Sequence, residues 1–142
     1  MKTKIVGILS FFALILFLVA GIVSATINFT NVPTLSKTSN SSTITVSSNQ
    51  NETLSFSIQD ITSNSKKITF SSIPTIIINS TASQTITINY VVDPNFEFVF
   101  GEDYSTVLTA TATGTGSPSP PANVTLHFAD SNFCEVGNDG EV

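Results

Sequence analysis

The chain has 142 residues, with five lysines, no arginine and ten acidic residues, and so a formal net charge of −5. A length near 140 fits one ordinary domain. Because neutralising phosphates takes clustered Lys and Arg, we expect no nucleic-acid binding. One histidine, His127, and one cysteine, Cys134, are too few for a zinc site of three or four ligands of these types. No phosphate-binding glycine loop is present, and we expect no cofactor.

The first 25 residues have the layout of an export signal. Lys2 and Lys4 precede 19 uncharged, mostly apolar residues at 5–23, and small side chains follow up to Ala25. This pattern predicts a signal peptide cleaved after Ala25. The apolar stretch would be about 28 Å long as a helix, close to the thickness of a bilayer's hydrocarbon core, so an uncleaved membrane anchor is the alternative. In both cases we expect the rest of the chain to be extracellular or at the cell surface.

From Thr26 onward, apolar and polar residues alternate with a period of two, which predicts β-strands. In chain order, the alternation predicts strands or short extended segments at 42–48, 53–58, 68–70, 76–78, 85–92, 96–100, 104–112 and 124–128. Turn residues separate them at 49–51, 64–65, 93–95 and 114–121. We expect the apolar run 76–78 to be buried on both sides.

Seven to nine short strands rich in Thr, Ile and Val predict an all-β, antiparallel β-sandwich over residues 26–130, preceded by the hydrophobic signal or anchor helix. No window outside the leader has a helical period. Ser and Thr number 40 of the 142 residues and occupy most outward-facing strand positions. Residues 131–142 form an acidic tail or the start of a following module.

Three segments resemble the immunoglobulin-like domains of archaeal and bacterial secreted surface proteins: 43–46, 51–58 and 101–111. In those domains a glycine is followed, a few residues on, by a tyrosine that opens the penultimate strand. Gly101 and Tyr104 match these places. The resemblance implies an immunoglobulin-like sandwich with Tyr104 as a tyrosine-corner candidate, whose hydroxyl bonds back to the backbone.

The closing segment 133–140, Phe-Cys-Glu-Val-Gly-Asn-Asp-Gly, is similar to the junction into a second segment in some archaeal surface-layer-associated proteins. That similarity implies that the chain is an N-terminal module of a longer protein.

The N-glycosylation pattern Asn-x-Ser/Thr occurs five times, without proline in the middle position. The asparagines are Asn28, Asn40, Asn51, Asn79 and Asn123. Asn40, Asn51 and Asn79 are the strongest candidates because they lie near predicted turns. The alternative is chance, because a chain with 12 Asn and 40 Ser and Thr generates such patterns.

Cys134 cannot form a disulfide within the chain, so we expect either an intermolecular disulfide or an inert thiol. We expect His127 on a strand surface, with no predictable relation to Cys134, and hence no Cys/His nucleophile. The acids Asp93, Glu97, Glu102 and Asp103, and those of the tail (Asp130, Glu135, Asp139 and Glu141), lack the spacing of a calcium loop. Glu97 and Glu102 could pair for glycoside hydrolysis, but nothing predicts a cleft around them.

Two functional hypotheses follow. The first is a non-enzymatic structural or adhesive module, secreted or displayed on the cell surface, with cell-envelope or other extracellular proteins as partners. The second is a carbohydrate-binding accessory module of a larger extracellular protein. Sugar sites usually stack rings on Trp or Tyr; the chain has no Trp, and Tyr90 and Tyr104 are both predicted to point inward. Membrane contact is expected only through an uncleaved leader, and self-association stays open.

Overall fold

The structure, a computed structural model, describes residues 25–99, 101–114 and 118–129. Within these ranges it contains nine strands in two antiparallel sheets, one with the order β1-β2-β7-β5-β4 and the other with the order β6-β3-β8-β9. The strands are β1 (Ile27–Thr30), β2 (Ser41–Ser48), β3 (Glu52–Ile58), β4 (Ile61–Ser63), β5 (Lys66–Phe70), β6 (Ile76–Ile78), β7 (Ser83–Val92), β8 (Ser105–Thr113) and β9 (Ala122–His127).

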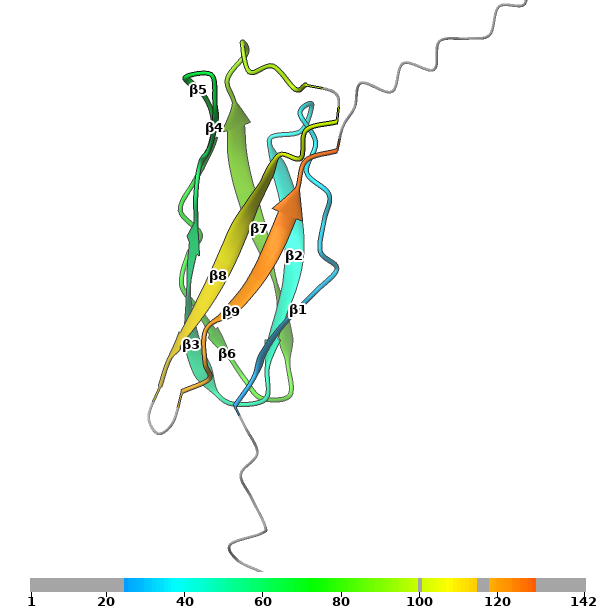
Figure 1. Ribbon diagram of the computed structural model, residues 1–142. Coiled ribbons are helices and arrows are strands. Elements are labelled where there is room, and N and C mark those ends of the chain that lie inside the picture. The colour runs from blue at the N-terminus through cyan, green and yellow to red at the C-terminus, as the bar shows by residue number, and fades with distance from the viewer. Residues whose placement is uncertain (1–24, 100, 115–117, 130–142) are drawn as a thin grey trace, which may run out of the picture.

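The two sheets pack face to face and enclose one core (Figure 1). Alternate residues of each long strand point inward, as the period of two requires. The five-stranded sheet contributes buried residues from β2 and β7: Ile44, Val46, Ile86, Ile88 and Tyr90. The four-stranded sheet contributes buried residues from β3, β8 and β9: Leu54, Leu108, Ala110 and Leu126. The prediction of an all-β, sandwich-like fold with seven to nine antiparallel strands is confirmed.

The five-stranded sheet curls because β5 pairs only with the last three residues of β7. Its register joins Ile68 to Val92 and Phe70 to Tyr90. The β4–β5 hairpin therefore extends beyond one end of the sandwich, beside the end of β7 (Figure 1). The ring of Phe70 reaches the core there, with its centroid 5.8 Å from that of Tyr90.

The two ends of the described chain lie at opposite ends of the sandwich (Figure 1). The N–H of Thr26 donates to the side chain of Asn49 in the β2–β3 turn. At the other end, Leu35 forms a parallel bridge with Phe128, and the N–H of Ala129 donates to the Leu35 carbonyl at 2.8 Å.

The prediction that 76–78 is buried on both sides is wrong. Ile78 is fully buried, whereas Ile76 is half-buried and Ile77 is 72% exposed. The reason is that β6 is a three-residue edge strand that, among the described strands, pairs only with β3, and no described residue covers its outer face. The 96–98 segment, expected as a short extended stretch, is not part of a strand: it follows a turn in which the N–H of Phe96 donates to the Asp93 carbonyl. The alternation is kept, because Phe96 is buried and Phe98 is half-buried, whereas Glu97 between them is exposed.

The predicted turn at Asn64 and Ser65 is confirmed as the two-residue connection of the β4–β5 hairpin. Both residues have positive φ, 47° and 65°, as a type I′ turn requires. Serine is strained in this conformation, whereas glycine is not. We expect Ser65→Gly to raise the free energy of unfolding by about 1 kcal/mol. Urea denaturation measures this; the same substitution at Ser55, in the middle of β3, serves as a control and should destabilise.

Candidate functional sites

All five asparagines of the glycosylation patterns are exposed. Three lie next to connections: Asn40 directly before β2, Asn51 in the β2–β3 turn and Asn79 in the β6–β7 turn. Asn28 and Asn123 lie within β1 and β9, the edge strands of their sheets. A substituent on any of the five side chains can therefore project into solvent without displacing the core.

The hydrogen bonds of two of these asparagines involve the side-chain oxygen. The Oδ1 atom of Asn51 accepts from the N–H of Ser80 at 2.9 Å, and that of Asn123 accepts from the Thr109 hydroxyl at 2.8 Å. An N-glycan is attached to the other atom, Nδ2. These contacts hold the side chains in place and are compatible with glycosylation.

Hydroxyl groups cover the outer faces of the long strands. The register places Thr43 opposite Thr87 and Thr45 opposite Thr85 on one sheet. On the other sheet it places Ser55 opposite Thr111 and Ser57 opposite Thr109. Strands β2, β7 and β8 contain no charged residue, and the only charge in β3 is Glu52, which points inward. The broad faces of the domain therefore carry mostly hydroxyl groups and few charges, and Ile77, Val91 and Val107 are apolar side chains exposed among them.

The Tyr104 side chain is buried, and its hydroxyl bonds back to the preceding backbone. The oxygen accepts from the N–H of Val99 at 3.2 Å and lies 3.3 Å from the Glu97 carbonyl. The carboxylate of Glu102 accepts from the same hydroxyl at 2.7 Å. Tyr104 stays a tyrosine-corner candidate, with the contacts that this role needs.

Tyr90 makes a similar contact that the sequence pattern did not identify. It is 1% exposed, and its hydroxyl donates to the carbonyl of Ser36 at 2.9 Å and accepts from the Ser36 N–H at 3.1 Å. Its ring packs edge-on against that of Phe128, with centroids 5.3 Å apart. Tyr90 thereby fixes the segment between β1 and β2 over the end of the core.

Glu52 is a buried carboxylate that the sequence analysis missed. It is 4% exposed, and Ser48 Oγ donates to Oε2 at 2.7 Å. The backbone N–H of Ser119 donates to Oε1 at 2.6 Å, and the Ser119 hydroxyl donates to Oε2 at 2.9 Å. Burial opposes ionisation, but these three hydrogen bonds outweigh it and hold the pKa of Glu52 below its ordinary value of 4.5.

The alternation did contain a signal for Glu52, because it lies two residues before Leu54 and so shares its inward face. The partner could not be foreseen: Ser119 is 67 residues away in a proline-rich connection.

His127 lies on the outer face of β9, as predicted, and its Nδ1 atom is 2.9 Å from a carboxylate oxygen of the Asp103 side chain. Both side chains are more than half exposed. Cys134 and the tail acids, like leader residues 1–24 and Phe100, lie outside the described residues. In the described part of the chain, no three His, Cys, Asp or Glu side chains are grouped to hold a metal ion. Glu102 is bound to Tyr104, whereas Glu97 lines a surface hollow.

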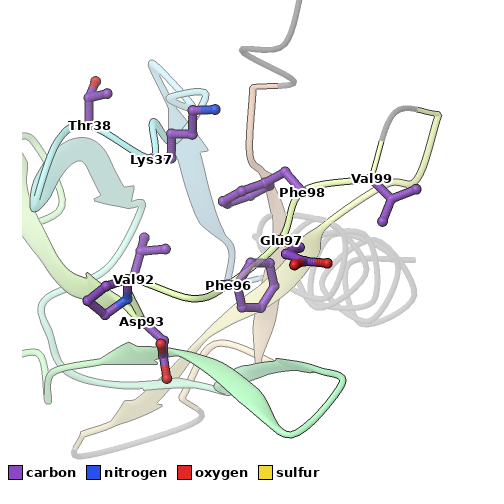
Figure 2. A pocket seen from close by; sticks show the side chains of 9 residues that line it. Lys37, Thr38, Val92, Asp93, Phe96, Glu97, Phe98 and Val99 are labelled. Atoms are coloured by element: carbon purple, nitrogen blue, oxygen red, sulfur yellow. The ribbon is translucent and has the colours of Figure 1, made fainter.

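This hollow, of about 660 Å³, lies at the end of the sandwich where β7 finishes (Figure 2). Lys37 and Thr38 lie on one side of it, and Val92, Asp93 and Phe96 lie on the other. The ring of Phe98 extends between the two sides, with the Lys37 ammonium 5.9 Å from its centroid. The hollow combines aromatic surface with a cation and the carboxylates of Asp93 and Glu97.

Comparison of the chain with known protein families and with curated proteins gives no match. Among the residues that the structure describes, no helix is long and apolar enough to cross a membrane.

Proposed function

We propose that the chain is an exported, N-glycosylated structural or adhesive module of a cell surface, built on an immunoglobulin-like sandwich. The observation that carries the proposal is the composition of its outer surface: hydroxyl-covered, nearly uncharged sheet faces with all five pattern asparagines exposed. Such a surface stays hydrated without relying on charge, and each exposed asparagine offers an attachment point for a glycan.

Two further features support this proposal. The leader at 1–25 has the pattern of an export signal or anchor. The first and last described residues lie at opposite ends of the sandwich, an arrangement that suits a module placed in line between neighbouring segments (Figure 1). Its partners would be other proteins of the cell envelope or the extracellular space.

The glycans can be tested by mass. Protein isolated from its own cells should be heavier than the bare chain and should lose the excess on chemical deglycosylation. Thr81→Ala destroys the pattern at Asn79 and should abolish modification of that residue, whereas Thr81→Ser preserves the pattern and serves as the matched control. An intact mass equal to that of the bare polypeptide would refute the glycosylation.

The second candidate is a carbohydrate-binding accessory module, and the hollow beside Phe98 is the observation that favours it. Tyr90 and Tyr104 are buried, so neither ring can stack on a sugar. Phe98 is half-buried at the hollow, next to carboxylates that can accept hydrogen bonds from sugar hydroxyls. A glycan array in which the chain binds and Phe98→Ala does not would favour this function; an array without signal for the unaltered chain would remove it.

A further inference from the structure

Among the described residues, Glu52 is the one charged side chain at the end of the sandwich where β3 begins. The strands that surround it, β2, β6 and β8, contain no Asp, Glu, His, Lys, Tyr or Cys. The β2–β3 turn, the β6–β7 turn and the β8–β9 connection contain none either. If the leader is removed after Ala25, the new α-amino group of Thr26 also lies at this end, and it stays protonated throughout the acid range in which Glu52 titrates. Among the described residues, the carboxylate is therefore bound by two hydroxyl donors and one backbone amide, and it forms no salt bridge.

These donors come from segments that are far apart in the sequence. Ser48 is the last residue of β2, and its hydroxyl also accepts from the N–H of Gln50. Ser119 belongs to the connection between β8 and β9. The carboxylate thus joins the ends of both sheets to that connection.

The only backbone donor of the 118–121 segment is bound by Glu52. Residues 118–121 read Pro-Ser-Pro-Pro, so Ser119 carries the only backbone N–H in this stretch. That N–H donates to Glu52 Oε1, and the Ser119 side chain is buried against the same carboxylate. Hydrogen bonds to an ionised acceptor are roughly twice as strong as those to a neutral one. Protonation would weaken both of these bonds together.

We propose that Glu52 is an acid-sensitive latch: its carboxylate holds the 118–121 segment on the end of the sandwich, and protonation releases that segment while the sheets stay paired. The direction follows from the hydrogen bonds, which favour the ionised carboxylate in the folded protein. The latch is closed at neutral pH and opens as the pH falls through the folded-state pKa of Glu52, which lies below its ordinary value.

Hydrogen–deuterium exchange of the full chain, followed by mass spectrometry, can read the latch at a single amide. Overlapping peptides that differ only by residues 118–121 differ by one backbone N–H, that of Ser119. The protection of the Ser119 N–H against exchange, relative to the urea-unfolded chain at the same pH, should fall at least tenfold between pH 6 and pH 3. The backbone amides of β2 and β7 should keep their protection over the same range.

Variants separate the latch from general acid unfolding. In Glu52→Gln, the Ser119 protection should already be at least tenfold lower at pH 6 and should not change further with pH. Glu102→Gln, at an exposed acid bound to Tyr104, should leave Ser119 unaffected. Ser119→Ala keeps the backbone donor but loses the hydroxyl, so its release should occur at higher pH. Ser119 protection that is independent of pH in the unaltered chain, or equal in Glu52→Gln, would overturn the proposal.

Discussion

Replacing Tyr90 by alanine should lower the free energy of unfolding by about 3–5 kcal/mol, the usual cost of truncating a buried aromatic side chain. The Tyr90 side chain is 1% exposed, and its ring contacts those of Phe70 and Phe128. Its hydroxyl also binds both backbone polar groups of Ser36. Domains of this size are stable by about 5–15 kcal/mol, so the variant should lose a large fraction of its stability and unfold at a clearly lower urea concentration.

Two substitutions serve as controls in the same urea denaturation series. Tyr90→Phe removes only the hydroxyl and should cost about 1–2 kcal/mol, because it leaves the polar groups of Ser36 without this partner. Val91→Ala, at the neighbouring position on the opposite face, is 64% exposed and should change stability by less than about 0.5 kcal/mol. Equal effects at the two positions would contradict the described packing.

The second large effect is expected at Glu52. At pH 7, Glu52→Ala should cost about 3 kcal/mol, because the N–H of Ser119 and two serine hydroxyls lose a buried, ionised acceptor. The contribution should also depend on pH. The pKa of Glu52 is lower in the folded than in the unfolded chain, so the stabilisation is present above about pH 4.5 and is lost as the pH falls through the folded-state value.

Measuring the free energy of unfolding of the unaltered chain and of Glu52→Gln from pH 7 to pH 3 isolates this contribution. The difference between the two should shrink as the pH falls, since glutamine does not titrate. A constant difference across the range would show that ionisation of the Glu52 carboxylate does not contribute to the free energy of unfolding.

The strand pattern could be predicted well from the sequence where alternation was strong. In β7, Ile86, Ile88 and Tyr90 alternate with Thr85 and Thr87, and the first three are the buried residues of the strand. Such a pattern fixes which face is buried because the period of a strand is two.

The prediction failed where burial depended on neighbours that alternation does not identify. Three consecutive isoleucines at 76–78 predicted a run buried on both sides, but β6 lies at an edge with Ile77 exposed. Sheet order depends on which strands pair over long separations, and a local pattern carries no such information. The curl of the larger sheet, which follows from the short pairing of β5 with β7, could not be predicted for the same reason.

The candidate sites also divide into those with a local sequence pattern and those that depend on distant segments. The glycosylation patterns are local, so they could be found, and the structure adds that each asparagine is exposed. The Glu52 cluster and the hollow at Phe98 bring together side chains from distant segments. Ser119 binds Glu52 although the two are 67 residues apart, and the Lys37 ammonium lies over the Phe98 ring. Neither arrangement has a sequence motif.

Surface labelling of intact cells tests the central claim, display of this module outside the cell, most directly. Lys67 lies exposed on the β4–β5 hairpin and can react with a membrane-impermeant amine reagent. We expect the peptide that contains Lys67 to be labelled on unbroken cells, while cytosolic proteins of the same cells stay unlabelled. Labelling of Lys67 only after lysis would contradict the proposed location and, with it, the proposed function.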